Sequence, residues 1–389
     1  MAMNGLIVST VLPGRARSGG SLVTHRVVEE LRSMGCATTV IGYAHDDEPV
    51  SPSEINVERR IVETRRVPFS ALCWGAASLV HGKPYIAQKF ISSAYIQRLQ
   101  ELLRIAPWDF VVIDHAQMAW ALPHLRCYPT FHLSHNAESR LYADLARKRV
   151  GPARWVYERE TRLIEAAERQ LAQDCDEIWT LSTADAQYFR DLGARAVRNL
   201  SIPVAIHTSS AQKDRRTDVA ILGSWTWEAN RVGLDWYVRE VHPRLPSDLK
   251  VEIAGRGAED LAGTASNLSV CGPVDDAAAF LSGASCIAVP SIAGAGIQIK
   301  TLDAIATGKP VVATPVAMRG IEAPPDSVTV VESPAAFAAA LVAQCQHAGE
   351  WADAGIRWSQ ARQQAFSTEL RESVHRIISF ESGALIAAH

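Results

Sequence analysis

Short, continuously apolar segments alternate with longer amphipathic segments along this chain. In its first half the apolar segments are residues 6–11, 38–42, 110–113, 130–133 and 177–181. Segments of this length without polar alternation are typical of strands that are buried on both faces of a parallel sheet. The helical pattern between them is clearest at residues 21–34, 93–105 and 154–174. The alternation of the two patterns predicts a doubly wound α/β domain.

The pattern is interrupted at residues 201–217 and then begins again. This stretch combines Pro203, paired serines and a run of charged residues without periodicity, so we expect an exposed linker. Apolar segments return at residues 218–222, 250–253, 268–271, 286–289, 311–313 and 328–331. The sequence therefore predicts one α/β domain at 1–200, a second at 218–358, and a helical end at 359–389.

Length and composition narrow the function classes. The 389 residues suit two domains, and a net charge of −3 excludes nucleic acid as the main partner. The apolar segment 6–12 is too short to span a membrane and follows no basic residues, so it is a strand and not a signal peptide. Seven scattered cysteines without a C-x-x-C pair indicate reduced thiols. We expect a cytoplasmic protein that is not integral to a membrane.

No metal site emerges from the spacing of potential ligands. The D-x-D triplet at residues 174–176 ends a predicted helix, where solvated charges are common. No cluster of histidine, cysteine and carboxylate residues has the spacing of a metal site. The sequence therefore predicts chemistry without a metal ion or another cofactor.

The most informative chemistry lies between Val289 and Thr314. A predicted strand ends there in a loop with Gly294 and Gly296, and a helix follows that carries Lys300 and Asp303. A glycine loop that opens a helix offers free backbone N–H groups and the positive end of the helix dipole to a phosphate. By itself a G-x-G triplet also fits an ordinary tight turn. The complete stretch is V-P-S-I-A-G-A-G-I-Q-I-K-T-L-D-A-I-A-T-G-K-P-V-V-A-T.

This stretch resembles the nucleotide-binding segment of retaining glycosyltransferases of the GT-B fold, family four (glycosyl transferases group 1), of the polysaccharide-biosynthesis type. Members commonly read G-x-G-I-x-x-K-x-L-E-A-M-A-x-G-x-P-V-V-A-T there. The resemblance implies two Rossmann-like domains that face a cleft holding a nucleotide-diphosphate sugar. It also implies that the last helix, within 359–389, crosses back to the N-terminal domain.

The resemblance assigns the donor-binding residues of this segment. The backbone amides of Gly294, Ala295, Gly296 and Ile297 would hold the diphosphate, and Asp303 would meet the ribose hydroxyls. The family often has two glutamates eight residues apart. Asp303 replaces the second and Ala295 the first. Lys300 would then supply the charge that faces the leaving diphosphate, while a weakened or non-catalytic protein is the alternative.

Further motifs follow other predicted strands. In the N-terminal domain the resemblance points to the Gly19-Gly20 loop and to His135, with His132 as a rival on the opposite side of the strand. In the second domain it points to five further donor-binding residues: Gly223, Arg231, Gly255, Gly272 and Val274. Asn230 is expected to cap a helix. Ordinary strand-to-helix turns and a solvated arginine are the alternatives for these positions.

The resemblance implies transfer of a sugar to a saccharide or lipid-linked acceptor with retention of configuration. A GT-B isomerase acting on the nucleotide sugar and a non-catalytic nucleotide-sugar-binding protein are the competing interpretations. Arg59-Arg60 and Arg65-Arg66, near Trp74, could form a peripheral contact between the N-terminal domain and anionic lipid at the inner face of a membrane. A solvated loop is the alternative for that segment.

Overall fold

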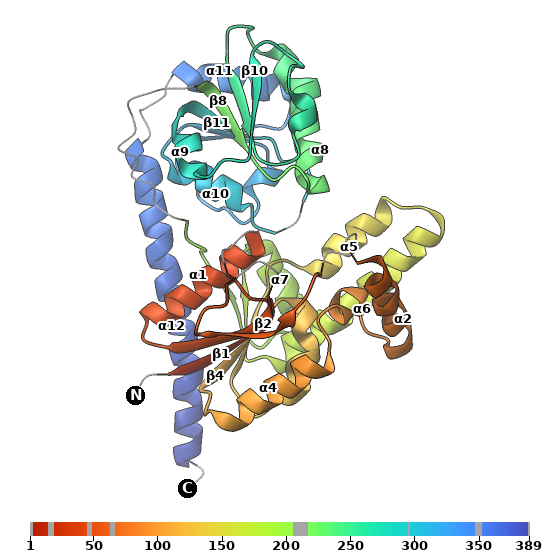
Figure 1. Ribbon diagram of the computed structural model, residues 1–389. Helices are drawn as coiled ribbons and strands as arrows, with labels where there is room; N and C mark the ends of the chain where they lie inside the picture. The colour runs from red at the N-terminus through yellow and green to blue at the C-terminus, as the bar shows by residue number, and fades with distance from the viewer. Residues whose placement is uncertain are drawn as a thin grey trace. The chain divides into compact units, whose positions relative to one another are not determined.

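The computed structural model describes residues 3–14, 19–44, 49–62, 67–204, 217–294, 296–346 and 352–387. The chain divides into two compact units (Figure 1). Unit 1 comprises Met1–Ile202 together with Ala365–His389, and unit 2 comprises Pro203–Gln364. Each unit contains one parallel sheet flanked by helices.

The sheet of unit 1 has the strand order β3-β2-β1-β4-β5-β6-β7, with every neighbouring pair parallel. Its central strands are almost fully buried, which explains their continuous apolar sequences. The strands are β1 (Asn4–Val11), β2 (Ala37–Ala44), β3 (Glu54–Arg59), β4 (Phe110–Asp114), β5 (Thr130–Leu133), β6 (Glu177–Thr180) and β7 (Val197–Asn199).

Helices cover both faces of this sheet, and Figure 1 shows α1 and α4 on opposite sides of β1, β2 and β4. Tyr95 of α4 is buried at the centre of one face, where its hydroxyl donates to the carbonyls of Ser9 and Ile41. The helices are α1 (Gly19–Ser33), α2 (Pro68–His81), α3 (Tyr85–Gln88), α4 (Ser93–Ile105), α5 (Glu138–Arg147), α6 (Gly151–Asp174) and α7 (Thr183–Asp191), with the 3-10 segment η2 (Ala116–His124).

The sheet of unit 2 repeats this topology in the order β10-β9-β8-β11-β12-β13, again parallel throughout. Its strands are β8 (Thr217–Leu222), β9 (Val251–Ala254), β10 (Leu268–Gly272), β11 (Ala284–Val289), β12 (Val311–Ala313) and β13 (Val328–Val330). Its helices include α8 (Glu228–Trp236), α9 (Ala277–Ser282), α10 (Ile299–Ala306) and α11 (Pro334–Gln346). In both sheets the strand order reverses between the first and fourth strands in sequence, β1 and β4 or β8 and β11, and ligands of such folds bind at the carboxyl ends of the strands there.

The last helix, α12 (Ala352–Ala387), belongs to unit 2 in its first part and to unit 1 from Ala365 onward. Its unit 1 portion makes specific polar contacts. The Trp179 indole donates to Ser373 over 2.7 Å, and Arg376 forms an ion pair with the buried Glu177 over 2.9 Å. Glu369 accepts hydrogen bonds from the backbone and hydroxyl of Ser201.

The structure confirms the predicted fold class of two Rossmann-like domains. The sequence pattern does not reveal the edge strands β3 and β7, which are short and half-exposed. Of the expected linker, residues 205–216 lie outside the described part of the chain, while Ile202 and Val204 are buried. All seven cysteines lie in the described part of the chain, and none of them forms a disulfide there. Among the described residues, no helix combines the length and the apolar character needed to cross a membrane.

Candidate functional site

A buried carboxylate lies at the switch point of the unit 1 sheet. Asp114 is the last residue of β4, and its side chain has no solvent exposure. One carboxylate oxygen accepts hydrogen bonds from the hydroxyls of Ser9 (2.6 Å) and Thr24 (2.9 Å), and the other accepts from Nε2 of His135 (2.7 Å). Residues from β1, α1, β4 and the end of β5 therefore converge on one side chain.

The charge state of Asp114 follows from these contacts. Burial works to raise its pKa, but the neighbouring His115 and His135 and the hydrogen bonds from His135 and Ser9 outweigh burial. The pKa of Asp114 is consequently held well below its usual range. An ionised carboxylate can only accept hydrogen bonds, so Nε2 of His135 must carry the proton.

In the neutral imidazole, a proton on Nε2 leaves Nδ1 of His135 as a hydrogen-bond acceptor. His135 lies two residues beyond β5, and its side chain is 10% exposed. Nδ1 is buried and has no hydrogen-bond partner in the part of the chain that the structure describes. A buried polar atom without a partner is unusual in a folded protein. Nδ1 is therefore suited to accept a hydrogen bond from a ligand hydroxyl.

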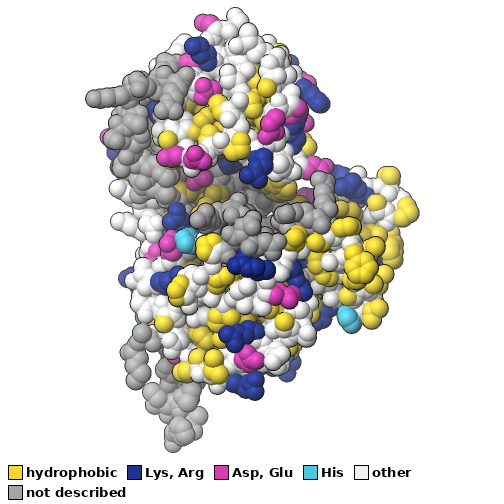
Figure 2. Space-filling model, viewed as in Figure 1, with side chains coloured by type: hydrophobic (Ala, Val, Ile, Leu, Met, Phe, Trp, Pro, Cys, Tyr) yellow, Lys and Arg dark blue, Asp and Glu magenta, His cyan; other side chains and the backbone are white. Residues whose placement is uncertain are grey.

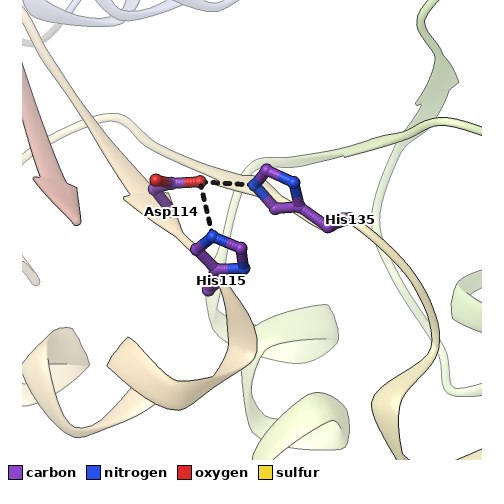
Figure 3. A group of neighbouring side chains, drawn as sticks. All are labelled: Asp114, His115 and His135. Carbon is purple, nitrogen blue, oxygen red and sulfur yellow. Dashed lines mark hydrogen bonds and ion pairs between the residues drawn. The ribbon is translucent and has the colours of Figure 1, made fainter. Parts of the chain in front are cut away.

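His115 completes the cluster (Figure 3). Its ring stacks on that of His135 with 3.7 Å between the centroids and 12° between the planes. Burial first, and then the proximity of His135, lower the pKa of His115 to about 3, so the residue is neutral at physiological pH. His115 also has a φ of 73°, a conformation that residues other than glycine rarely adopt. Strain of this kind is concentrated at functional sites.

The N-terminus of α1 contacts the two rings. Gly19 is the first residue of α1, and a Cβ atom added at Gly20 would lie 3.4 Å from the His115 ring and 3.7 Å from Nδ1 of His135. The first turn of a helix has backbone N–H groups without helical partners. A Cβ at Gly20 would make only ordinary van der Waals contacts, so the first turn of α1 lies beside the histidine pair but the packing there does not require glycine.

Asp114, His115 and His135 are also residue types that bind metal ions, and their donor atoms lie within 4.8 Å of one another. A metal ion binds a histidine nitrogen at about 2.0–2.1 Å, close to the plane of the ring. The two rings are nearly parallel and stacked at 3.7 Å, so a single ion cannot lie in both planes. Asp114 already accepts three hydrogen bonds. The cluster fits a set of groups that orient His135 better than it fits a metal site.

The rival histidine lies in the core. His132 of β5 has no exposure, its Nδ1 lies 3.0 Å from the carbonyl of Ile113, and its ring packs edge-on against Phe189. Burial lowers the pKa of His132 to about 4, which keeps the ring neutral. His132 is thus a packing residue on the side of the strand away from His135.

In unit 2 the main candidate donor-binding residues lie in the loop between β11 and α10 and on α10. Gly294 and Gly296 both have positive φ, at 117° and 71°, so the loop needs glycine at both positions. The Gly294 carbonyl accepts a hydrogen bond from Arg319. Ile297 is half-buried beside the core at the start of α10, and Asp303 is half-buried one turn into that helix. Ala295 lies outside the described residues.

Lys300 of α10 reaches α8. Its Nζ donates to Oδ1 of Asn230 over 2.7 Å, and the Asn230 amide donates to the carbonyl of Ser224 over 3.0 Å. Burial lowers the pKa of Lys300 to about 8. The expectation that Asn230 caps a helix is wrong, because α8 begins at Glu228 and Asn230 lies in its first turn. Its side chain instead links the β8–α8 loop to Lys300.

The predicted glycines at the ends of β8, β9 and β10 lie side by side. The Gly223 amide donates to the carbonyl of Ala254, and the Gly255 amide donates to the carbonyl of Gly272. A Cβ at Gly255 would lie 1.7 Å from the Gly223 carbonyl oxygen, so only glycine fits there. Val274 follows β10 and is half-buried. These residues form a closely packed backbone surface at the carboxyl ends of β8, β9 and β10, next to the start of α8.

Arg231 is engaged by carboxylates. Its guanidinium donates two hydrogen bonds to Asp260 and a third to Asp235, and one of its nitrogens also reaches the Gly257 carbonyl. These partners, Asp260 first, raise its already high pKa. Arg231 therefore fixes α8 to the β9 turn, and its charge is balanced within the unit.

Sequence reasoning missed Asp114 and His115. The signal was present, since both residues stand where a buried parallel strand ends, as His135 does. The predicted strand ends at Ile113, and the sequence pattern assigns no role to the two residues after it. Arg60, expected in a basic lipid contact, pairs with Glu58 and lies over the Tyr43 ring. Arg65 and Arg66 lie outside the described residues, and Trp74 is half-buried on α2.

Two family models match the sequence. One is described as glycosyl transferases group 1 and matches residues 216–347, and the other as a glycosyl transferase 4-like domain and matches residues 18–205. None of the curated proteins compared with the chain matches it.

Several solved structures share the whole fold. WaaG, a glycosyltransferase involved in lipopolysaccharide biosynthesis, is 15% identical with a TM-score of 0.64, over 96% of this chain and 99% of WaaG. Anabaena Alr3699/HepE, solved with UDP and glucose, is 14% identical with a TM-score of 0.60, over 99% of this chain and 100% of HepE. The pneumococcal O-GlcNAc transferase GtfA, solved with UDP and GlcNAc, is 10% identical with a TM-score of 0.61, over 97% of this chain and 99% of GtfA.

Proposed function

Because the chain belongs to the group 1 glycosyltransferases of the GT-B fold, we propose that it transfers a sugar from a nucleotide-diphosphate sugar to a saccharide or lipid-linked acceptor, with retention of configuration. The observation that carries the proposal is the segment between β11 and α10. Two glycines at positive φ, the start of a helix and the Lys300 amine occur together there. That combination suits a diphosphate.

On the donor side, the backbone amides of residues 294–297 bind the diphosphate, and Asp303 accepts hydrogen bonds from the ribose hydroxyls. Lys300 provides the positive charge on the same helix face, one turn before Asp303. We assign Arg231 no part in this binding, since its guanidinium is hydrogen-bonded to Asp235 and Asp260. Solved proteins of the same fold that hold UDP with a sugar support this class of donor.

In the reaction, the acceptor hydroxyl attacks the anomeric carbon on the face from which the diphosphate departs. The bond between that carbon and the phosphate oxygen breaks, its electron pair stays on the oxygen, and the oxygen takes the acceptor proton. Lys300 and the start of α10 stabilise the negative charge that develops on the leaving group. His135 holds a sugar hydroxyl through Nδ1 while Asp114 fixes the ring. None of these steps requires a metal ion.

The first test measures donor binding by thermal shift against a panel of nucleotide-diphosphate sugars. A ligand at about a hundred times its dissociation constant adds roughly 2.7 kcal/mol of stability. We expect one donor to raise the melting temperature, Asp303→Asn to abolish the rise, and Asp248→Asn to retain it. Asp248 is an exposed carboxylate just before β9, far along the strand from the candidate residues. No rise with any nucleotide sugar would contradict the donor assignment.

The second test measures transfer with the donor that the first one identifies. We expect His135→Ala to lower the transfer rate about ten- to a hundredfold, the cost of one hydrogen bond in a polar site. The anomeric configuration of the product, read by NMR, tests retention. An altered sugar released without any acceptor would identify an isomerase instead. Donor binding without turnover under every acceptor would identify a non-catalytic protein, in line with Ala295 in place of the first glutamate.

A further inference from the structure

Helix α2 places apolar side chains in solvent instead of in the core. Its sequence, P-F-S-A-L-C-W-G-A-A-S-L-V-H, carries no charge before its final histidine, yet Ser78 is its only fully buried residue. The large side chains exposed are Phe69 (79%), Leu72 (74%), Leu79 (66%) and Val80 (80%). Their spacing of three, seven and one residues keeps them along one side of a helix. An apolar helix of this kind is normally covered.

The start of α6 extends this surface. Val150, just before α6, is 85% exposed, and Trp155 is 57% exposed. Arg159, one turn after Trp155, donates hydrogen bonds to the carbonyl and hydroxyl of Ser78, which fixes α2 beside α6. Figure 2 shows the resulting concentration of apolar side chains on the flank formed by α2, α5 and α6. We call Phe69, Leu72, Leu79, Val80, Val150 and Trp155 the apolar flank.

Basic residues border the apolar flank. Residues 147–156 include Arg147, Lys148, Arg149 and Arg154 and contain no acidic residue, and residues 67–83 contain none either. The carboxylates that reach this border are Asp144, which pairs with Arg147, and Glu158, which pairs with Arg154. Lys148 is exposed, and Arg149 lies over the Tyr157 ring. The border thus carries an excess of positive charge.

We propose that the apolar flank docks on a lipid bilayer with anionic headgroups. Apart from Cys73, whose thiol is a weak donor, and His81 at the C-terminal end, the exposed positions of α2 carry no hydrogen-bonding side chain, whereas a protein interface needs about one hydrogen bond per 100–200 Å². Apolar side chains of an interfacial helix enter the boundary between headgroups and acyl chains, while flanking Lys and Arg side chains meet lipid phosphates. The composition of the flank and its border matches this environment. This surface differs from the arginines of residues 59–66 that the sequence suggests.

Vesicle flotation of the full chain tests the proposal without any donor or acceptor, so its result is independent of the proposed function. The vesicles contain phosphatidylcholine alone or mixed with phosphatidylglycerol. We expect binding to the mixed vesicles and weaker binding as salt increases. Phe69→Ser together with Leu72→Ser should lower the partition constant at least about tenfold, since each side chain loses its burial in lipid. Lys148→Ala and Arg154→Ala should each lower it about fivefold.

Helix α4 supplies the matched controls. Arg104 and Ile105 are exposed there, outside the apolar flank, and Arg104→Ala and Ile105→Ser should leave binding unchanged. Quenching of Trp fluorescence by brominated lipids gives a second readout, which Trp155→Phe should reduce. Failure of the unchanged protein to bind mixed vesicles overturns the proposal. So does equal binding by the Phe69→Ser, Leu72→Ser variant. Concentration-dependent dimerisation that the same variant abolishes would identify a second copy of the chain as the occupant instead.

Discussion

The two sheets share the same strand order. At their carboxyl ends, however, the functional groups are held in place by different means. In unit 1 the groups are side chains bound to one another, with Asp114 accepting three hydrogen bonds at the centre. In unit 2 the edge is built from backbone, with Gly223, Gly255 and Gly272 in contact and Lys300 as the cation. A network of side-chain hydrogen bonds is disrupted when one of its side chains is removed. Closely packed backbone is disrupted when a Cβ atom is added to it. The comparison therefore predicts which substitutions each unit tolerates.

The largest effect should follow the removal of the central carboxylate of unit 1. Asp114→Ala removes the carboxylate to which Ser9, Thr24 and His135 donate and leaves Nε2 of the buried His135 without its acceptor, so it should cost about 3–5 kcal/mol of unfolding free energy. Urea unfolding, with hydrogen exchange of peptides from β4 and β5, measures the loss in unit 1. Asp144→Ala removes an exposed carboxylate and should cost less than about 1 kcal/mol. Similar values for the two variants would refute the central role of Asp114.

Unit 2 should be destabilised by the addition of a single methyl group at a closely packed glycine. Gly255→Ala puts a Cβ 1.7 Å from the Gly223 carbonyl oxygen at a φ of 115°, and should cost about 3 kcal/mol. Gly272→Ala is the matched variant, because Gly272 also has positive φ but its Cβ would meet no atom within 4 Å. Gly272→Ala should lower the free energy of unfolding only by the cost of the left-handed backbone conformation, about 1–2 kcal/mol. Hydrogen exchange of β8 and β9 peptides compares the two, and equal losses would remove close packing as the reason for Gly255.

The charge of Lys300 in unit 2 should depend on pH. The pKa of Lys300 is about 8, so its charge, and with it diphosphate affinity, should decline roughly tenfold per pH unit above that value. Between about 8 and 10.5 the folded state binds fewer protons at this site than the unfolded state, so the contribution of Lys300 to stability increases with pH in that window. As the pH increases through this window, the diphosphate affinity should fall while the contribution of Lys300 to the free energy of unfolding rises.

Calorimetric titration of a nucleotide diphosphate at several pH values measures this dependence. Lys300→Arg keeps its charge and should give a flat profile up to about pH 10. Lys250→Met removes an exposed lysine at the start of β9 and should leave the profile of the unchanged protein intact. A profile that is the same for the protein and for Lys300→Arg would assign the pH dependence to another group.

The smallest effect should come from Arg231. Its bidentate partner Asp260 is 60% exposed and Asp235 is half-buried, so Arg231→Ala should cost less than about 1 kcal/mol and leave the donor affinity unchanged. Thermal melting with and without the donor measures both quantities. A loss of affinity beyond about tenfold would return Arg231 to the diphosphate site that the sequence suggested.

The sequence predicts those parts of the fold that depend on local pattern. Strands β5 and β12 are predicted to the residue, because they are buried on both faces and contain no Asp, Glu, Lys or Arg. Strands β3 and β7 are half-exposed, so their sequences, E-I-N-V-E-R and V-R-N, lack that pattern. The glycine loop before α10 is equally local, which is why its position could be predicted from the sequence.

The polar core of unit 1 is not local. Asp114 is stabilised by Ser9 and Thr24, which are 105 and 90 residues away in sequence. Neither hydroxyl shows any pattern that links it to a carboxylate. The same holds for Asn230 and Lys300, which are 70 residues apart. The role of such residues depends on tertiary packing, and only the folded chain reveals it.

The path of α12 has a consequence for how the protein is made. Unit 1 begins at the N-terminus but includes Ala365–His389, so the first unit to leave the ribosome is also the last to be finished. Until then Glu177 lacks Arg376 and Trp179 lacks Ser373, although both are buried in the finished protein. Unit 2 is contiguous and needs no residue beyond Gln364. A released chain truncated after residue 364 should therefore hold a native unit 2 beside an unfinished unit 1, so completion of the N-terminal unit depends on the C-terminal segment.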